Sequence, residues 1–219
     1  DDIFPLRPEK VTFLNSLVAP HSDILDVACG TGSLAIALAK LEHDVIGIDL
    51  SEEMIDQAKR RAPGITWKTM DMLKIGKEFT QLDMISCLGN SLPHLGSEED
   101  ILSFLGQAHG ILREGGKLVI QCMDFSKDVS FPVIETEDVV FKRWYEKDDH
   151  VMFHTSLRIK SSGNVLESST PLYPLSLEQT EELLEGFSIE GVYADFSGTR
   201  FSDQDSWIVV AQKTSSEFH

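Results

Sequence analysis

The 219-residue sequence is short of basic residues. It has 19 Lys and Arg against 36 Asp and Glu, which gives a formal net charge of −17. A surface of that sign repels nucleic-acid phosphates and anionic membranes, so neither is expected as a partner. No apolar run is long enough to span a membrane, and there is no signal-peptide pattern. The length fits a single domain, or one domain with a sizeable insertion.

Cysteine is also scarce. Cys29, Cys87 and Cys122 are an odd number, and none belongs to a C-x-x-C pair. This usage indicates a reducing compartment, so we expect a cytoplasmic protein whose cysteines are small buried hydrophobic residues rather than reactive thiols. No cluster of His, Cys or Asp has the spacing of a metal site, so no metal is expected. The sequence begins at Asp1 and not at methionine, which indicates that a few residues precede it.

Short apolar segments alternate with helical segments through the first 123 residues. The expected strands cover 24–27, 45–49, 65–70, 82–88 and 117–123. The expected helices cover 8–18, 33–40, 52–61 and 98–112. The apolar spacing places Met54 on the inward face of the third helix and Leu102 on that of the fourth. A last helix begins at a Ser176–Gln179 capping box, and strands at 189–195 and 206–212 close the chain as an edge hairpin. The pattern predicts an α/β fold with a doubly wound, mostly parallel, seven-stranded sheet.

Residues 138–173 follow a different pattern, in which apolar and polar residues alternate. Expected strands at 139–146, 151–160 and 165–173 are joined by Asp148-Asp149 and by Ser162-Gly163-Asn164, which predicts an inserted three-stranded antiparallel meander. The meander is either a lid over the substrate or the interface of a homodimer. Some of its polar side chains are expected to point at the substrate, the candidates being Arg143, Tyr145, His154 and Arg158.

The segment from Ile24 to Ala35 combines a buried strand, a turn of small residues and the start of a helix. Ala28, Gly30 and Gly32 in the turn are small enough for a ligand to approach the backbone. The free N–H groups of the following helix favour a negatively charged ligand group. The spacing also fits the G-x-G-x-x-A form of the dinucleotide fingerprint, and a tight turn without a ligand is a third alternative.

Acidic residues follow the next two expected strands. Asp49 is well placed to accept hydrogen bonds from both hydroxyls of a ribose, although it could instead cap the helix that follows. Asp71 and Met72 are expected beside an adenine ring, which the thioether could contact; the alternative for Asp71 is a surface turn. In open parallel sheets, ligands bind at this carboxyl edge.

The motif Asp26-x-Ala28-x-Gly30-x-Gly32 resembles the first motif of the class I S-adenosylmethionine (SAM) dependent methyltransferases. The acids after strands two and three, the Gly115-Gly116 turn and the closing strand pair are also similar, over residues 22–123 and 176–212. The resemblance implies a Rossmann-like fold and an enzyme that transfers a methyl group from SAM to a small molecule by in-line displacement. The SAM-binding residues that it implies are Asp26, Ala28, Cys29, Gly30, Gly32, Asp49, Leu50, Met54, Asp71, Met72 and Leu88. The alternatives are a non-catalytic SAM- or nucleotide-binding regulator and an NAD-dependent oxidoreductase.

The segment from Cys87 to Leu95 is similar to the loop after strand four in glycine and sarcosine N-methyltransferases. This narrower resemblance implies that Leu88 and Asn90 border the methionine part of SAM and the acceptor, here an amine. Asn90 could orient that acceptor, and His94 could take its proton, because an unperturbed histidine titrates near neutrality. The alternatives are a helix-capping Asn90 and a His94 that only packs in its loop.

One residue departs from that narrower family. Met123 stands where the glycine and sarcosine enzymes carry an arginine that holds the carboxylate of the amino acid. A thioether cannot form a bidentate pair with a carboxylate, so glycine or sarcosine would need another arginine. The candidates are Arg143, Arg158 and Arg200.

Overall fold

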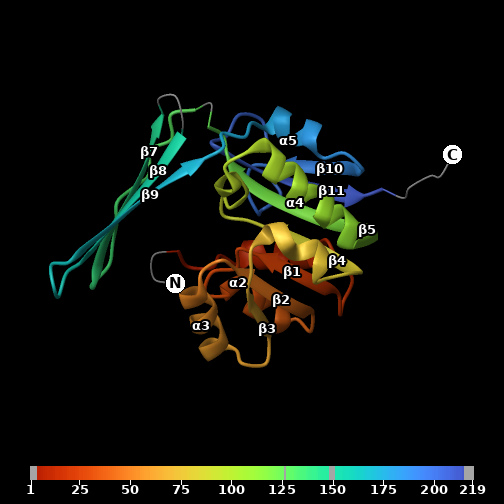
Figure 1. Ribbon diagram of the computed structural model, residues 1–219, viewed down its shortest axis with the longest axis horizontal. Helices are drawn as coiled ribbons and strands as arrows, with labels where there is room; N and C mark the ends of the chain where they lie inside the picture. Colours follow the sequence, from red (N-terminus) through yellow and green to blue (C-terminus); the bar gives the residue numbers. More distant parts are fainter. Residues whose placement is uncertain (1–3, 126, 148–150, 215–219) are drawn as a thin grey trace.

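A seven-stranded sheet forms the centre of the computed structural model, which describes residues 4–125, 127–147 and 151–214 (Figure 1). The strands lie in the order β10-β11-β5-β4-β1-β2-β3. β1 to β5 are parallel, whereas β11 runs antiparallel to β5 and β10 runs antiparallel to β11. The bounds are Asp23–Val27 (β1), Asp44–Asp49 (β2), Thr66–Thr69 (β3), Leu82–Cys87 (β4), Leu112–Met123 (β5), Phe187–Tyr193 (β10) and Ser206–Lys213 (β11). The predicted doubly wound, mostly parallel α/β sheet with a closing hairpin is confirmed.

Helices cover both faces of this sheet. α1, α2 and α3 pack on one face through a cluster that includes Leu14, Leu38 and Ile55. α4, α5 and the 3₁₀ helix η1 cover the other face, where Phe104 is fully buried. The bounds are Pro8–Ser16 (α1), Ser33–Ala39 (α2), Glu52–Arg61 (α3), Met72–Lys77 (η1), Leu92–Leu95 (η2), Glu98–Ile111 (α4) and Leu177–Leu183 (α5). Within the described ranges no helix has the length and apolar character needed to cross a membrane.

The predicted helix starts agree with the structure, but two predicted core positions do not. Side-chain caps at Ser51, Ser97 and Ser176 begin α3, α4 and α5. Met54 and Leu102, which the apolar spacing assigns to the buried faces of α3 and α4, are 39% and 45% exposed. Other side chains of each helix fill the contact with the sheet. In α3 these are Ile55 and Ala58, and in α4 they include Ile101 and Leu105.

β5 begins five residues before the predicted strand. Leu112 already pairs with Leu82 of β4, and the register shifts before the pairing of Met84 with Lys117. Gly115, with φ +76°, lies within this irregular stretch. The Gly-Gly pair therefore bends a continuous strand and does not precede it, because glycine accepts the positive φ that the register shift requires.

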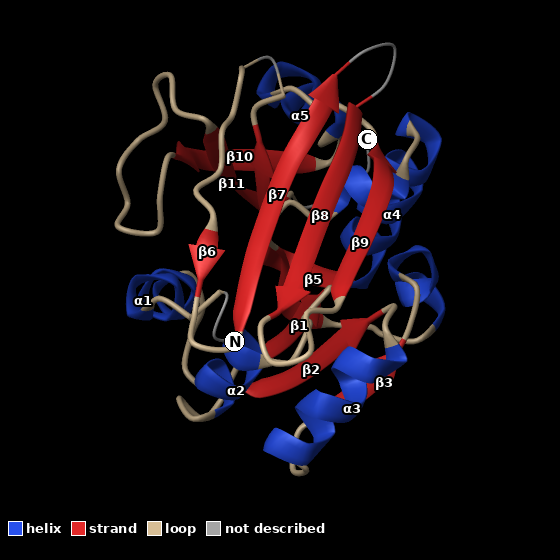
Figure 2. Cartoon of the chain, turned by 90° about the vertical axis from the view of Figure 1, so that its left-hand side faces the viewer, coloured by secondary structure: helices blue, strands red, loops and turns tan. Residues whose placement is uncertain are grey.

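The inserted region forms a second, antiparallel sheet, which has four strands and not three. Its strands are β6 (Ile134–Glu135), β7 (Val139–Lys147), β8 (Val151–Ile159) and β9 (Val165–Leu172). The two-residue β6 is too short to show an alternating pattern in the sequence. The predicted Asp148-Asp149 connection lies outside the described residues. We call β7–β9 the meander; Figure 2 shows it as a layer in front of the main sheet.

The two faces of the meander have different surroundings. The inner face carries Phe141, Arg143 and Tyr145 of β7, and the pairing Tyr145↔Phe153 places Phe153 on the same face. Tyr145 and Phe153 pack against a small cluster that includes Phe125, beyond the end of β5. The outer face carries the alternate residues, among them Trp144, His154 and Arg158. Of the four candidate residues of the meander, Arg143 and Tyr145 therefore lie on the inner face, whereas His154 and Arg158 lie on the outer face.

Candidate active site

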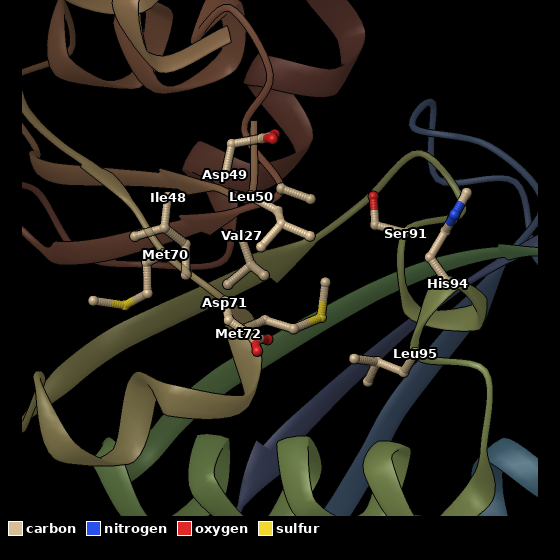
Figure 3. A pocket seen from close by; sticks show the side chains of 11 residues that line it. Val27, Ile48, Asp49, Leu50, Met70, Asp71, Met72, Ser91, His94 and Leu95 are labelled. Atoms are coloured by element: carbon tan, nitrogen blue, oxygen red, sulfur yellow. The ribbon is translucent and has the colours of Figure 1, made fainter. Parts of the chain in front are cut away.

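A cavity of about 270 Å³ opens at the carboxyl edge of the main sheet (Figure 3). Its walls come from the ends of β1, β2 and β3 on one side and from η2 on the other. In Figure 3, Ser91 and His94 lie across the cavity from Ile48 and Asp49. The lining residues are Val27, Ala28, Ile48, Asp49, Leu50, Met70, Asp71, Met72, Ser91, His94 and Leu95.

Asp49 at the end of β2 holds the glycine turn in place. Its Oδ2 accepts a hydrogen bond from the N–H of Gly30 (2.8 Å), and its Oδ1 accepts one from the N–H of Ser51 (2.9 Å). A carboxylate has about four acceptor sites, so each oxygen can still accept one hydrogen bond from a ligand. The cap of α3 is Ser51 and not Asp49, so the helix-capping alternative for Asp49 is wrong, and its remaining acceptor sites are available to a ribose.

The glycines of the turn have different reasons to be small. A Cβ on Gly30, where φ is +56°, would meet no atom within 4 Å. A Cβ on the buried Gly32 would overlap the ring of Trp67, and the same ring fills the space beside Gly47. Trp67 is fixed by a hydrogen bond of 2.9 Å from its Nε1 to the carbonyl of Ala62. The turn is therefore open to a ligand at Gly30, whereas the size of Gly32 is dictated by packing.

Arg61, the last residue of α3, forms hydrogen bonds to the same turn. Its Nη1 donates to the carbonyl oxygen of Thr31 (2.8 Å) and to the hydroxyls of Thr31 and Ser33 (3.0 Å each). The contact joins residues about thirty positions apart, so no local sequence signal identifies it.

Asp26 lies behind the turn and is only 3% exposed. Oδ1 accepts a hydrogen bond of 2.9 Å from the hydroxyl of Ser86 on β4. Burial raises the pKa of Asp26 to about 6, although this hydrogen bond and the positive charge of Lys10 act in the opposite direction. Asp26 is not among the residues that line the cavity, and its carboxylate also has a backbone hydrogen bond with Ala35 of α2.

Asp71 lies two residues after the end of β3 and is the N-cap residue of η1. Its Oδ1 accepts from the N–H of Leu73 (2.9 Å), so one of its oxygens already caps a helical turn. Both Asp71 and Met72 line the cavity. Leu50, which is 76% exposed, lies at the same opening and leaves an apolar surface without a protein partner above it.

Asn90 and His94 stand on the far side of the cavity, after β4. The Nδ2 of Asn90 donates to the hydroxyl of Tyr145 (3.2 Å), and its Oδ1 accepts from the N–H of Met123 (3.0 Å). His94 belongs to η2, its ring contacts that of Phe153 edge to face, and its side chain faces the cavity. His94 keeps an exposed surface, and desolvation by the surrounding protein lowers the pKa of its imidazole below the usual 6.5 of histidine.

The structure therefore divides the predicted site residues into two groups. Six of them line the cavity: Ala28, Asp49, Leu50, Asp71, Met72 and His94. Seven do not line it: Asp26, Cys29, Gly30, Gly32, Met54, Leu88 and Asn90. Five lining residues were missed: Val27, Ile48, Met70, Ser91 and Leu95. The missed residues neighbour predicted ones, and only their apolar or small character at a strand end could have indicated them.

Comparison with known proteins agrees with this geometry. A model described as a methyltransferase domain matches residues 24–116. Glycine/sarcosine N-methyltransferase of Halorhodospira halochloris is 30% identical over 211 residues, which is 87% of this chain and 75% of that protein. The CcbJ methyltransferase of Streptomyces caelestis has a similar structure, with a TM-score of 0.84, 19% identity and coverage of 98% of this chain and 93% of that one. SAM-bound CalS10, an amino pentose methyltransferase from Micromonospora echinaspora, has a TM-score of 0.72, with 18% identity and coverage of 93% and 88%.

The fold and the cavity at the carboxyl edge define a Rossmann-like enzyme that binds a nucleotide-containing cofactor. The chain belongs to the class I SAM-dependent methyltransferases. It is a small-molecule methyltransferase whose cofactor is SAM. The residues present fit that cofactor, since Asp49 keeps free acceptor sites, Gly30 leaves the turn open and the remaining wall is largely apolar.

Proposed function

We propose that this enzyme methylates an amine nitrogen of a small acceptor. The observation that carries the proposal is the position of His94, which lines the cavity and whose imidazole, with its lowered pKa, can accept the proton that an ammonium acceptor must lose before attack. The Halorhodospira relative, named as an N-methyltransferase acting on glycine and sarcosine, supports an amine acceptor. A non-catalytic regulator needs no proton acceptor, whereas an NAD-dependent oxidoreductase could also use one, so that alternative is separated by the cofactor and not by His94.

The cofactor half of the cavity would hold SAM through groups that the chain has already oriented. The free acceptor sites of Asp49 would take the ribose hydroxyls, and Asp71 with Met72 would contact the adenine. Leu50 would cover one face of the ligand, and Gly30 would let the methionine portion approach the backbone. When bound, SAM supplies a methyl group on a sulfonium, which makes in-line displacement by an oriented nucleophile the expected chemistry. The protein's part is to position the acceptor and to exclude water.

The acceptor half of the cavity would be completed by the inserted sheet. Tyr145 meets Asn90, and Phe153 meets His94, so the inner face of the meander contacts both predicted catalytic residues. We infer that residues 138–173 act as a lid within a single domain, and that Asn90 fixes the position of this lid while His94 faces the acceptor. An interface for a homodimer is the competing role.

The test is a binding measurement followed by a turnover measurement. SAM should raise the melting temperature, by linkage worth about 2.7 kcal/mol at a hundredfold excess over its Kd, and NAD should not. Asp49→Ala should remove most of this shift. Asp44→Ala is the matched control, because Asp44 is an exposed acid at the opposite end of the same strand.

Turnover is then followed as release of S-adenosylhomocysteine with primary and secondary amines and with hydroxyl acceptors of matched size. Release with amines and not with alcohols is the expected result. Release only with alcohols would overturn the amine assignment. A stabilisation by NAD and not by SAM would overturn the cofactor interpretation.

A further inference from the structure

One guanidinium group on the inner face of the meander has no anionic partner among the described residues. Arg143 is half-buried, and its Cζ lies 4.7 Å from the ring centroid of Phe4 and 4.3 Å from that of Phe131. Its Nε atom is buried and makes no hydrogen bond. The charged side chain is thus held in place by aromatic rings, while hydrogen-bonding capacity remains unused.

This arrangement is unfavourable unless an anion completes it. A guanidinium keeps its proton at any ordinary pH, so it cannot escape the cost of burial by neutralising. The burial lowers the pKa of Arg143, and the neighbouring Tyr145, whose own pKa is raised to about 12, is a neutral phenol at ordinary pH and supplies no compensating negative charge. Two other cations near the meander do have acidic partners, since Lys147 pairs with Asp128 and Lys160 pairs with Glu135. Although the chain has 36 acidic residues, none of those that the structure describes forms an ion pair with the half-buried Arg143.

Arg143 lies on the face of the meander that contacts Asn90 and His94. Tyr145 is two residues further along β7, which places it on the same face about 7 Å away. The hydroxyl of Tyr145 accepts the hydrogen bond from Asn90. Phe153, paired with Tyr145, contacts the cavity-lining His94. A small molecule between Arg143 and His94 would therefore lie against the inner face of the meander.

The other two candidate arginines are placed differently. Arg158 is exposed and lies on the outer face of the meander, opposite to that of Arg143. Arg200 is exposed in the hairpin loop between β10 and β11, with its Cζ over the ring of Tyr193. Both are hydrated and need no ligand to compensate their charge. The structure thus distinguishes among three arginines that the sequence left equivalent.

We propose that Arg143 binds an oxyanion of the acceptor, a carboxylate or a phosphate, so that the substrates of this enzyme are small amines that also carry an anionic group. The proposal rests on the proposed amine methylation for the identity of the reacting group. The planar guanidinium offers paired N–H donors, which suit the two oxygens of such a group. A net charge of −17 repels anions from the molecule, so a dedicated cation is required to retain one.

Anion binding is tested first without reference to turnover. The SAM-saturated and SAM-free proteins are titrated with sodium acetate, sodium phosphate and neutral acetamide at constant ionic strength, and the ¹⁵N–¹H signal of the Arg143 Nε is followed. Loss of that signal in Arg143→Met assigns it. We expect a saturable shift with acetate or phosphate and none with acetamide. A shift with acetate alone indicates an acceptor that carries a carboxylate. A shift with phosphate alone indicates a phosphorylated acceptor. If neither anion produces a saturable shift, the proposal is overturned.

Matched variants then connect anion binding to catalysis. Glycine is compared with glycinamide, and phosphoethanolamine with ethanolamine, as acceptors. Arg143→Met keeps the side-chain volume and should raise the KM of the anionic member by about thirtyfold or more, with the Kd of SAM unchanged. Arg143→Lys keeps the charge but not the planar guanidinium, so its KM for the anionic acceptor should lie between those of the wild type and Arg143→Met. Arg158→Met, the same change on the outer face, should behave as the wild type.

The two proposals fail separately. If anions bind at Arg143 but no amine is methylated, the proposed amine methylation is wrong and the anion site stands. If amines are methylated with equal KM changes for the anionic and neutral members in Arg143→Met, the anion site is wrong and the amine methylation stands. A circular dichroism spectrum identical to that of the wild type excludes misfolding as the cause of any loss.

Discussion

The Nδ2 atom of Asn90 donates a hydrogen bond of 3.2 Å to the hydroxyl of Tyr145, and this bond joins the main sheet to the meander. The Oδ1 atom of the same side chain accepts from the N–H of Met123 at the end of β5. Asn90 has φ +67°, a left-handed conformation that asparagine tolerates better than most residues. The residue therefore links the meander to the carboxyl edge of the main sheet.

Removing this side chain should affect the acceptor more than SAM. Asn90→Ala leaves the N–H of Met123 without its partner and frees Tyr145, so we expect turnover to fall by at least about tenfold. The Kd of SAM should stay within a few fold. Tyr145→Phe removes only the contact with the meander and should lose less. Asn90→Gly, which accepts the positive φ, separates backbone strain from the loss of the amide. Full activity of Asn90→Ala would remove Asn90 from the acceptor site.

The fold could be predicted from the sequence because its strands are short, apolar and separated by helices with recognisable caps. The order of elements alone then places Asp49 and Asp71 at the carboxyl edge. Contacts between distant segments could not be predicted in this way. Two examples are the contact of the Trp67 ring with Gly32 and the hydrogen bond from Arg61 to Thr31. Both depend on how three separate segments pack together. Neither has a local signature.

The meander shows the same limit at another scale. Strand alternation predicts that Arg143 and Trp144 point to opposite faces, but it does not say which face meets the cavity. That choice depends on the contacts of Tyr145 with Asn90 and of Phe153 with His94, made between segments more than fifty residues apart. Sequence reasoning therefore left Arg143 and Arg158 equivalent.

The buried Asp26 should make folding stability depend on pH. Its folded-state pKa of about 6 lies above its ordinary value of 3.8, so between these values the folded protein holds a proton that the unfolded chain has lost. The contribution of Asp26 to the free energy of unfolding is therefore largest below pH 4 and falls, by about 3 kcal/mol, as the pH rises towards 6.

Urea unfolding of the wild type and Asp26→Asn at pH 4 to 7 measures this effect, because the difference between the two cancels the other carboxylates. Stability of the variant should increase relative to the wild type as the pH rises. Ser86→Ala removes the hydrogen bond that favours the ionised form, so it should move the window to higher pH. Parallel pH profiles for the wild type and Asp26→Asn would contradict the raised pKa.

The packing of Trp67 predicts which glycine is needed for stability alone. A Cβ on Gly47 would overlap the ring of Trp67, whose hydrogen bond to Ala62 prevents it from moving aside. Gly47→Ala should therefore cost about 1–3 kcal/mol in the free energy of unfolding. Gly64→Ala, which meets no atom within 4 Å, is the control. Equal stability of the two variants would show that the ring yields easily.

The two faces of the meander separate its two candidate roles. Trp144 on the outer face is 44% exposed and stacks on His154, whereas Phe153 on the inner face contacts His94. If the meander is a lid, Phe153→Leu should raise the KM of the acceptor, and Trp144→Ser should leave turnover unchanged. Sedimentation velocity of both variants checks assembly. A dimer that Trp144→Ser dissociates, with loss of turnover, would assign the meander to the subunit interface.

His94 should give the pH–rate profile its acidic limb. Its pKa lies below the usual 6.5 of histidine, so the imidazole is charged in acid and becomes able to accept a proton as the pH rises. The wild-type rate should therefore climb through that lowered pKa and level off above it. Deprotonation of the amine acceptor itself would add a second limb at much higher pH, which is independent of the enzyme.

His94→Gln keeps a polar side chain of similar size without a titratable nitrogen, so the acidic limb should disappear and the plateau should fall by about a hundredfold. Asp26 titrates in a neighbouring range, and Asp26→Asn provides the control: a limb that persists in this variant does not come from Asp26. Because Phe153 only contacts the edge of the imidazole, Phe153→Leu should change the KM of the acceptor and leave the limb in place. If His94→Gln and the wild type show the same pH profile, His94 takes no proton from the acceptor, and its imidazole serves only to pack against the meander.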